Sequence, residues 1–269
     1  MMREKFISFG GGVQTTAMIL IDDIINNVDE VIFADTGAEH PETYAYIAKY
    51  VKPYLLDKNI PFTTVRMKKQ IRDVETDERL EATSLREAVW HRKRVPSLRN
   101  RWCTEYSKIT PIKLYLRQMQ KDGVYVKPAT GIIGISIDEK HRSYNKDGSW
   151  KHPHHSEYRN EYPMVVKQIS RNQCKKLIRD HGWPEPVKSG CYFCPFQGGK
   201  EWHKLYQNSP SLFWDAVALE ERDINFPKYR LYQRKPLRSL AVSFGEGNMS
   251  LFDDYEGLAC VEVEASCMM

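Results

Sequence analysis

The sequence contains no apolar run near the roughly 18 residues that a membrane-spanning helix needs, so it predicts no transmembrane segment. Its first residues, MMREKFISF, lack the long apolar core of a secretory signal peptide. Internal repeats and low-complexity tracts are missing as well, which argues against a repeat architecture. With 269 residues, of which 41% are hydrophobic and 28% charged, we expect a cytoplasmic globular protein without a membrane partner.

A strong charge imbalance is also absent. The net charge is only +5, which by itself does not identify a nucleic-acid-binding protein. The positive charge is uneven, however, because residues 86–101 contain a single acidic residue, Glu87, among these basic ones: Arg86, Arg92, Lys93, Arg94, Arg99 and Arg101. This basic run predicts either a phosphate-binding surface or a solvated helix face.

Short apolar segments alternate with amphipathic ones along the chain. Strands are expected at 5–9, 30–34, 62–66 and 131–137, with helices at 16–27 and 41–56 and a long polar loop at 138–160. This order predicts an α/β protein with a five-stranded-type parallel sheet and helices on both faces. We expect a nucleotide-binding α/β domain over residues 1–168 and a small cysteine-bearing lobe over residues 169–269.

The stretch SFGGGVQTTA, residues 8–17, places three glycines between a strand and a helix. Backbone N–H groups and the helix dipole meet at such a junction, so it predicts a phosphate or sulfate site. The lysine followed by serine or threonine of a Walker A loop is missing. A dinucleotide fingerprint would use Gly10 and Gly12, but Thr15 stands at its third glycine position. Since Asp35 lies where a ribose-binding acid belongs, a nicotinamide or flavin enzyme remains an alternative.

The chain has six cysteines: Cys103, Cys174, Cys191, Cys194, Cys260 and Cys267. In a cytosolic protein they should be reduced, so metal binding or catalysis is expected before disulfides. Cys191 and Cys194 form a CxxC pair, and the second pair of a zinc ribbon is missing. With Cys103 and Cys174, the irregular set suits an iron–sulfur cluster or zinc; reduced structural or redox-active thiols are the third interpretation. Cys260 and Cys267 are expected to be free thiols, or one of them a persulfide carrier.

Several motifs together resemble one superfamily. GGGVQT (10–15) resembles the pyrophosphate loop of the adenine-nucleotide α-hydrolase superfamily, usually SGGxDS, and its glutamine variant resembles phosphoadenylyl-sulfate reductases and their relatives. FADTGAEHPETY (33–44) resembles the second-strand motif of this reductase-like family, and GISIDEKHR (134–142) its later G-I-x-x-D-E-x-x-R segment. RWCTEYSKITPIK (101–113) and residues 174–196 resemble its cysteine-bearing members.

The resemblance implies a fold of this superfamily, ATP with Mg²⁺ as ligand, and roles for particular residues. The nucleotide-binding residues would be Ser8, Gly10, Gly11, Gly12, Gln14, Thr15, Thr16, Asp35 and Thr36. The residues with a catalytic role would be Gln14, Asp138 and Arg142. A [4Fe–4S] cluster, or zinc in its place, would be held by Cys103, Cys174, Cys191 and Cys194. Gln14 replaces an aspartate that could help to hold Mg²⁺ beside a triphosphate.

The same resemblance implies an ATP pyrophosphatase that adenylates an oxygen of its substrate. Sulfur from a cysteine desulfurase then replaces this oxygen, which leaves as part of AMP. The expected partners are that desulfurase, nucleic acid, with DNA before tRNA, and other sulfur-modification subunits; DNA phosphorothioation of the Dnd or Ssp type is the leading expectation. A sulfonucleotide reductase is an alternative, although the tail GLACVEVEASCMM lacks the E-C-G-L-H motif of those enzymes. Thiolation of tRNA and a non-enzymatic nucleotide-sensing subunit are further alternatives.

Overall fold

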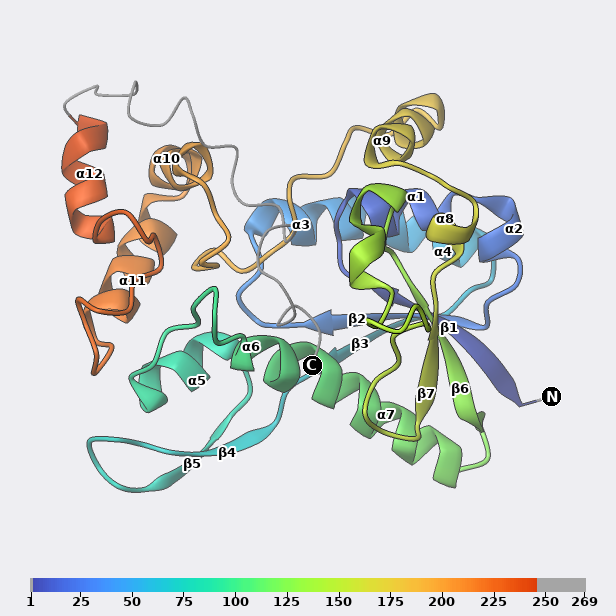
Figure 1. Cartoon of the computed structure of the whole chain (residues 1–269), viewed down its shortest axis with the longest axis horizontal. Helices are drawn as coiled ribbons and strands as arrows, with labels where there is room; N and C mark the ends of the chain where they lie inside the picture. The colour runs from blue at the N-terminus through green and yellow to red at the C-terminus, as the bar shows by residue number, and fades with distance from the viewer. Residues whose placement is uncertain (1, 246–269) are drawn as a thin grey trace.

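A five-stranded, fully parallel sheet forms the centre of the computed structural model, which describes residues 2–245 (Figure 1). The strands run in the order β3 (Phe62–Arg66), β2 (Glu30–Asp35), β1 (Arg3–Phe9), β6 (Tyr125–Ile133) and β7 (Tyr158–Glu161). Every neighbouring pair is parallel. The carboxyl ends of all five strands therefore meet at one edge of the sheet, where the expected glycine turn follows β1.

Helices cover both faces of this sheet, as the sequence predicts. One face carries α1 (Val13–Ile19), α2 (Asp22–Ile25), α8 (Pro163–Val166), α9 (Arg171–Asp180) and a continuous helical run made of α3 (Pro41–Tyr46), a π-helical turn η1 (Ile47–Val51) and α4 (Lys52–Asp57). The other face carries α7 (Thr110–Lys121). Consecutive strand residues point to opposite cores, Phe6 toward α7 and Ile7 toward α1. Burial on both faces explains why the inner strands are almost continuously apolar.

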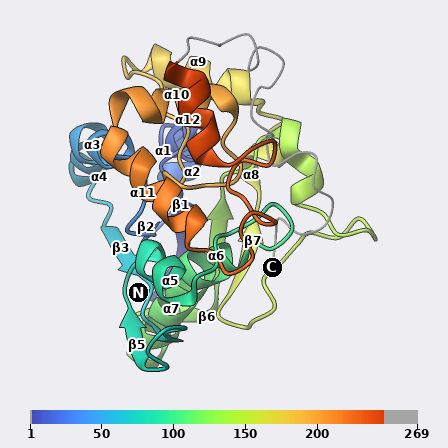
Figure 2. The ribbon, with the colours of Figure 1, turned by 90° about the vertical axis from the view of Figure 1, so that its left-hand side faces the viewer.

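A second core joins the C-terminal helices to the middle of the chain. It packs residues of α10 (Gly199–Asn208), α11 (Pro210–Glu221) and α12 (Leu237–Gly245) against α5 (Leu85–Arg92). The hairpin of β4 (Lys69–Arg72) and β5 (Arg79–Ala82) contributes to this core, and the short α6 (Trp102–Thr104) with its π-helical continuation η2 (Glu105–Ile109) packs against it. The 3₁₀ turn η3 (Ile137–Arg142) instead lies against α8. Figure 2 shows α10, α11 and α12 stacked above α5.

The packing divides the chain differently from the expected boundary after residue 168. Helix α9 lies against α1, and its Cys174 and Ile178 belong to the core of the sheet. Helix α5, although far earlier in the sequence, packs with the C-terminal helices. The helical lobe is therefore assembled from two separated segments of the chain.

Three expected elements differ in extent. The helix expected at 16–27 begins at Val13, directly after the glycines, and is split into α1 and α2. The strand expected at 131–137 ends at Ile133, because residues 134–136 turn into η3. The expected loop 138–160 contains most of the edge strand β7. No helix within residues 2–245 combines the length and the apolar character needed to cross a bilayer.

Candidate functional site

The glycine loop, residues 10–12, turns from β1 into α1 and packs tightly on one side. Gly11 has φ +73°, and a Cβ there would lie 2.7 Å from Thr43 Cγ2. A Cβ on Gly12 would lie 2.7 Å from Ser189 Oγ, whereas one on Gly10 would meet nothing within 4 Å. Gly11 is thus required by its left-handed backbone and Gly12 by its close neighbour. The sequence predicted the loop and not these two contacts.

Thr15 closes the loop from within. Its hydroxyl accepts a hydrogen bond from Gly10 N at 3.3 Å and donates one to Gly12 O at 3.2 Å. The end of β6 packs against the same residue, since a Cβ on Gly134 would lie 2.6 Å from Thr15 Cγ2. Thr16, also predicted to bind nucleotide, is fully buried, and its hydroxyl has no hydrogen-bond partner among the described residues. Ser8 lies next to the end of β1, paired with Ile133 of β6.

The three residues predicted to be catalytic come together beside the first turn of α1. Gln14 Nε2 donates a hydrogen bond to Glu139 Oε2 at 3.4 Å, and Arg142 Nη1 forms an ion pair with the same oxygen at 2.9 Å. Asp138, next to Glu139 in η3, accepts a hydrogen bond from the backbone N–H of Arg171 at 2.5 Å. The G-I-x-x-D-E-x-x-R segment and the glycine loop are therefore one site.

Arg171 is a member of this site that the sequence did not single out. Its Nη1 donates a hydrogen bond to Gln14 Oε1 at 2.9 Å, so Gln14 is held between a carboxylate and a guanidinium. The capping box of Ser170 and Gln173 fixes the start of α9 and with it the position of Arg171. The capping pattern was visible in the sequence, but nothing in it indicated that this helix begins opposite the glycine loop.

Asp35 and Thr36, at the end of β2, organise the loop that follows the strand. Asp35 Oδ1 accepts hydrogen bonds from Gly37 N at 2.8 Å and Tyr44 OH at 2.6 Å, and Oδ2 accepts from Arg66 Nε at 2.8 Å. The hydrogen bond from Arg66 and the charge of Asp35 raise the pKa of Arg66. Both oxygens of Asp35 thus hold protein donors, which gives this buried carboxylate a positioning role in the turn.

Thr36 leads directly to the CxxC loop. The Cys191 Sγ lies 3.4 Å from Thr36 Oγ1, and Tyr192 N donates a hydrogen bond to Ala38 O at 2.9 Å. Glu39 and Cys191 form an isolated antiparallel bridge. The second-strand motif and the CxxC, about 150 residues apart in the chain, are consequently paired in space.

The structure does not bring together the four cysteines predicted to hold a metal. Cys103, Cys191 and Cys194 pack in or against the core of the helical lobe. Cys174 is fully buried in the core of the sheet, with its Sγ 3.8 Å from Met164 Sδ, because it faces inward on α9. Within residues 2–245, no three His, Cys, Asp or Glu side chains converge in a geometry that could hold a metal ion. The four thiols therefore do not fit a [4Fe–4S] cluster or zinc here, and Cys260 and Cys267 lie outside the described residues.

Burial, rather than neighbouring charge, has the largest influence on the pKa values of the thiols that the structure describes. It raises the pKa of Cys174 and of Cys194 to about 11, and that of Cys103 and Cys191 in the same direction. Lys108 is one of the cations near the helical-lobe cysteines, and its Nζ lies 3.6 Å from Glu39 Oε1. The charge of Glu39 raises the pKa of Lys108.

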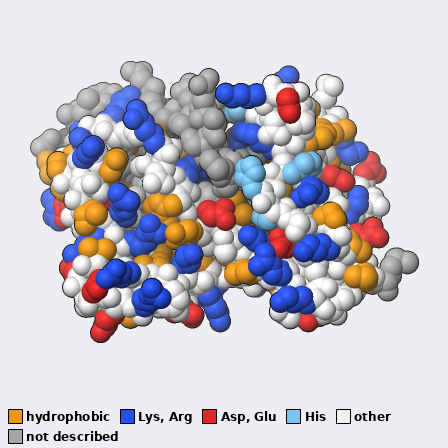
Figure 3. Space-filling view, turned by 60° about the horizontal axis from the view of Figure 1, so that its bottom comes forward, with side chains coloured by type: hydrophobic (Ala, Val, Ile, Leu, Met, Phe, Trp, Pro, Cys, Tyr) orange, Lys and Arg blue, Asp and Glu red, His pale blue; other side chains and the backbone are white. Residues whose placement is uncertain are grey.

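Much of the basic run at 86–101 is engaged in joining α5 to its neighbours. Arg86 Nη2 lies 2.6 Å from Asp215 Oδ1 on α11, and Lys93 Nζ lies 2.6 Å from Glu75 Oε1. The Arg92 guanidinium lies 4.6 Å from the ring centroid of Trp102. Figure 3 shows one face of the molecule, where Lys and Arg side chains are spread among apolar and uncharged ones. These basic residues therefore have a structural role, which neither the phosphate-binding nor the solvated-face interpretation predicted.

The sheet, the glycine loop and the residues gathered at its carboxyl edge define an α/β nucleotide-binding protein. Residues 4–126 match the family described as the phosphoadenosine phosphosulfate reductase domain. The match confirms the resemblance expected from the motifs.

Two curated relatives come from Methanocaldococcus jannaschii. The uncharacterized protein MJ0066 is 23% identical over 240 residues, covering 81% of this chain and 42% of the relative. The uncharacterized protein MJ0973 is 26% identical over 227 residues, covering 80% of this chain and 47% of the relative. The chain therefore spans less than half the length of the curated relatives it matches. A crystal structure of phosphoadenylyl-sulfate (PAPS) reductase from Candida auris, a phosphate complex, matches 68% of this chain and 75% of that chain at 15% identity with a TM-score of 0.39.

Proposed function

We propose that the protein is an ATP pyrophosphatase-type sulfurtransferase that adenylates an oxygen of its substrate and replaces it with sulfur. The observation that carries the proposal is the pair of arginines at the glycine loop. Arg171 bonds to Gln14 in the first turn of α1, and Arg142 pairs with Glu139, which bonds to the same glutamine. Two fixed guanidinium groups beside a glycine turn suit the charge of a polyphosphate.

The carboxylate missing from the loop has a neighbour that can take its place. Gln14 is neutral, but it lies against Glu139, and Asp138 is the adjacent residue. Mg²⁺ is commonly held by one or two carboxylates together with substrate phosphates, without a complete protein cage. Asp138 and Glu139 fit such a half-site, and a bound Mg²⁺ would neutralise charge on the leaving pyrophosphate.

The reaction in this proposal has two displacement steps. The first is at the α-phosphorus of ATP, and the second is at a phosphorus or carbon atom of the acceptor. An oxygen of the acceptor attacks the α-phosphorus of ATP, and pyrophosphate leaves with the electron pair of the broken P–O bond. A persulfide delivered by a cysteine desulfurase then attacks the activated atom of the acceptor with its outer sulfur, and the oxygen leaves as part of AMP. A second thiol attacks the resulting disulfide, so that the outer sulfur stays on the acceptor as a thiolate and a new disulfide forms between the two thiols. Nucleic acid is the proposed acceptor, with DNA phosphorothioation as the first system to test and other sulfur-modification subunits as partners.

Sulfonucleotide reduction is a second candidate, favoured by one contact. Ser189 lies two residues before Cys191 and touches the glycine loop at Gly12, so the CxxC loop is held beside the anion site. A sulfonucleotide bound at the loop would therefore lie near a protein thiol, as reduction by a cysteine requires.

Gly11 in the loop and Gly245 in the helical lobe supply a matched test. Protein purified without air would be incubated with ATP and Mg²⁺, with and without DNA, a cysteine desulfurase and cysteine, and assayed for pyrophosphate, AMP and sulfur in DNA. Gly11→Ala should reduce pyrophosphate release at least about 100-fold, since it combines a left-handed backbone with a 2.7 Å overlap. Gly245→Ala, at the end of α12, meets nothing within 4 Å and should keep most of the activity.

Each other outcome identifies a different function. Reduction of a sulfonucleotide without pyrophosphate release would overturn the pyrophosphatase and support the second candidate. Tight ATP binding without turnover under all these conditions would indicate a nucleotide-sensing subunit. Equal loss of activity in both glycine variants, with the fold intact by circular dichroism, would contradict the steric argument for Gly11.

A further inference from the structure

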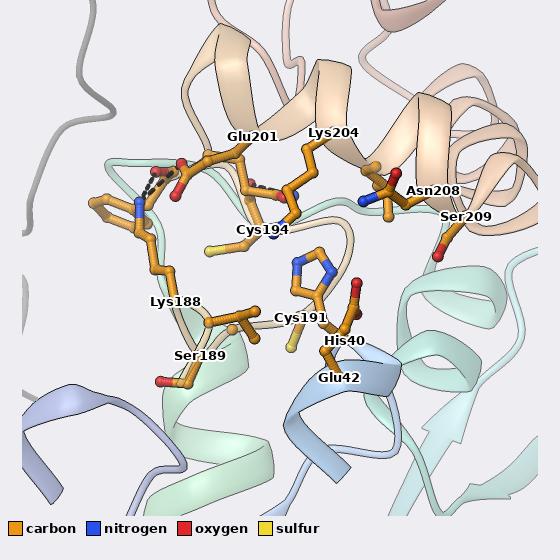
Figure 4. A pocket seen from close by; sticks show the side chains of 15 residues that line it. His40, Glu42, Lys188, Ser189, Cys191, Cys194, Glu201, Lys204, Asn208 and Ser209 are labelled. Carbon is orange, nitrogen blue, oxygen red and sulfur yellow. Dashed lines mark hydrogen bonds and ion pairs between the residues drawn. The ribbon is translucent and has the colours of Figure 1, made fainter. Parts of the chain in front are cut away.

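A pocket of about 200 Å³ lies between the start of α3, the CxxC loop and α10 (Figure 4). His40 and Glu42 form one wall, Lys204 and Asn208 of α10 the opposite wall, and Cys191 and Cys194 lie on the loop between them. The mechanism proposed above uses none of these side chains. The pocket therefore lies at the carboxyl edge but outside the proposed ATP site, and a ligand for it has to be inferred from its own lining.

The size and lining of the pocket suit one flat ring. A cavity of about 150 Å³ admits benzene in another protein, so about 200 Å³ leaves room for a substituted aromatic ring but not for a whole nucleotide. Val187, Phe196 and Leu205 supply apolar walls. The Arg101 guanidinium covers the Phe196 ring at 4.7 Å from its centroid, which fixes that ring as a platform. Flat heterocycles are bound by such a combination of an apolar wall and a few polar groups at one end.

The polar end of the pocket offers hydrogen-bond acceptors. Gln197 is only 7% exposed; its Nε2 donates to Tyr192 O at 2.8 Å, and its side chain also hydrogen-bonds to His40. Glu42 Oε2 is buried without a donor from residues 2–245. A buried acceptor left unpaired costs roughly 1–3 kcal/mol. Both residues line the pocket, so a ligand N–H group would pair the Glu42 oxygen and relieve this cost.

The pocket adjoins the glycine loop. Ser189 lines it and is also the residue that a Cβ on Gly12 would touch. A group bound in the pocket would accordingly lie next to the nucleotide phosphates and next to the two CxxC thiols.

We propose that this pocket binds a single nucleobase that carries an exocyclic amine, presented by the nucleic-acid acceptor. The inference rests on the proposed function and narrows its substrate to a nucleic acid that can turn a base out of its stack. The amine donates toward the Glu42 and Gln197 oxygens while the ring lies against Phe196. Bases with a carbonyl in place of the amine present an acceptor to these acceptors and are rejected.

Cytidine and uridine test this directly, because they differ only where an amine replaces a carbonyl and in the proton on N3. Binding to the full chain would be measured by calorimetry with a non-hydrolysable ATP analogue already bound. We expect cytidine to bind at least tenfold more tightly than uridine, and Glu42→Gln to weaken cytidine about tenfold. Asn208→Trp, at an exposed position on the pocket wall, should abolish binding, and the neighbouring exposed Gln207→Trp should not.

Three results would overturn the inference. The first is no cytidine binding at about 10 mM, with or without the ATP analogue. The second is equal affinity for the two nucleosides, and the third is cytidine binding that occurs only when the ATP analogue is left out. The last would assign the pocket to the adenine of ATP itself. None of these measurements depends on pyrophosphate release, so failure of the proposed function and failure of the pocket assignment are distinguishable.

Discussion

The two edges of the parallel sheet differ in how completely their glutamates are paired, with Glu30 at one edge and Glu39 and Glu42 at the other. At the amino edge, Glu30 is 1% exposed and both of its oxygens are paired. Oε1 accepts from Tyr115 OH at 2.8 Å and from Thr63 Oγ1, and Oε2 accepts from Tyr125 OH at 2.8 Å and from Arg3 Nη1 at 3.1 Å. Glu30 therefore needs no ligand to pair its oxygens.

At the carboxyl edge, buried polar atoms gather without partners among the described residues. They include the hydroxyls of Thr16, Thr43 and Ser136 and one oxygen each of Glu39 and Glu42. Native proteins pair most buried polar groups, so a local concentration of unpaired ones indicates a place built for something that is not protein. The difference between the edges thus assigns stability to Glu30 and ligand binding to the opposite end of the same strands.

The largest expected effect is at Glu30. Glu30→Gln removes the charge that Arg3 and three hydroxyls surround, and should lower the free energy of unfolding by about 3–5 kcal/mol. Urea denaturation would measure this loss. ATP affinity below the unfolding transition should remain within about twofold of the parent, because Glu30 is at the edge away from the glycine loop.

Glu139→Gln is the matched change at the carboxyl edge. It should cost no more than about 1 kcal/mol of stability, since Glu139 is partly exposed, yet weaken Mg²⁺-dependent ATP binding more than tenfold. If the two variants behaved alike in both measurements, the division between a structural and a functional edge would be wrong.

Helix α9 carries a smaller effect that depends on pH. Burial raises the pKa of Cys174 from 9.0 to about 11, so the folded protein keeps a proton that the unfolded chain loses. The stability contributed by the protonated thiol is complete below pH 9 and is lost as the pH rises to 11. Over that range it should fall by about 1.4 kcal/mol per pH unit.

Urea titrations of the parent and of Cys174→Ala between pH 8 and 11 isolate this contribution, because all other groups titrate in both proteins. The difference in stability between them should shrink by roughly 2–3 kcal/mol as the pH rises. Parallel curves would mean that Cys174 is not buried in the sheet core and would reopen its assignment as a metal ligand.

The parts of this site that the sequence revealed are those with a local pattern. Three glycines after an apolar strand predicted the loop, and Asp138 and Arg142 were found through a contiguous motif. Strand β7 was missed because an edge strand reading YRNE has no apolar alternation. Cys174 was grouped with the CxxC because residues 174–196 resemble cysteine-bearing members of the family, but α9 turns it into the core shared with α1. Arg171 escaped notice because its partner, Gln14, is 157 residues away.

The smallest expected effect is a difference in ATP binding between variants of two capping boxes that have the same hydrogen-bond pattern. Ser84 Oγ accepts from Glu87 N and Ser170 Oγ accepts from Gln173 N, each at 3.2 Å. Replacing either serine with alanine should cost about 1 kcal/mol in the free energy of unfolding. Thermal denaturation of the two variants should therefore give similar shifts.

Only Ser170→Ala should also weaken ATP binding, by several-fold. The start of α9 sets the backbone N–H of Arg171 against Asp138 and its guanidinium against Gln14, whereas α5 begins against the main chain of Thr36 and packs into the helical lobe. Fraying of the first turn of α9 thus loosens both contacts at the glycine loop, and fraying of α5 loosens neither. Equal ATP affinity in the two variants would show that Arg171 is held by Gln14 alone and that the cap serves the helix but not the site.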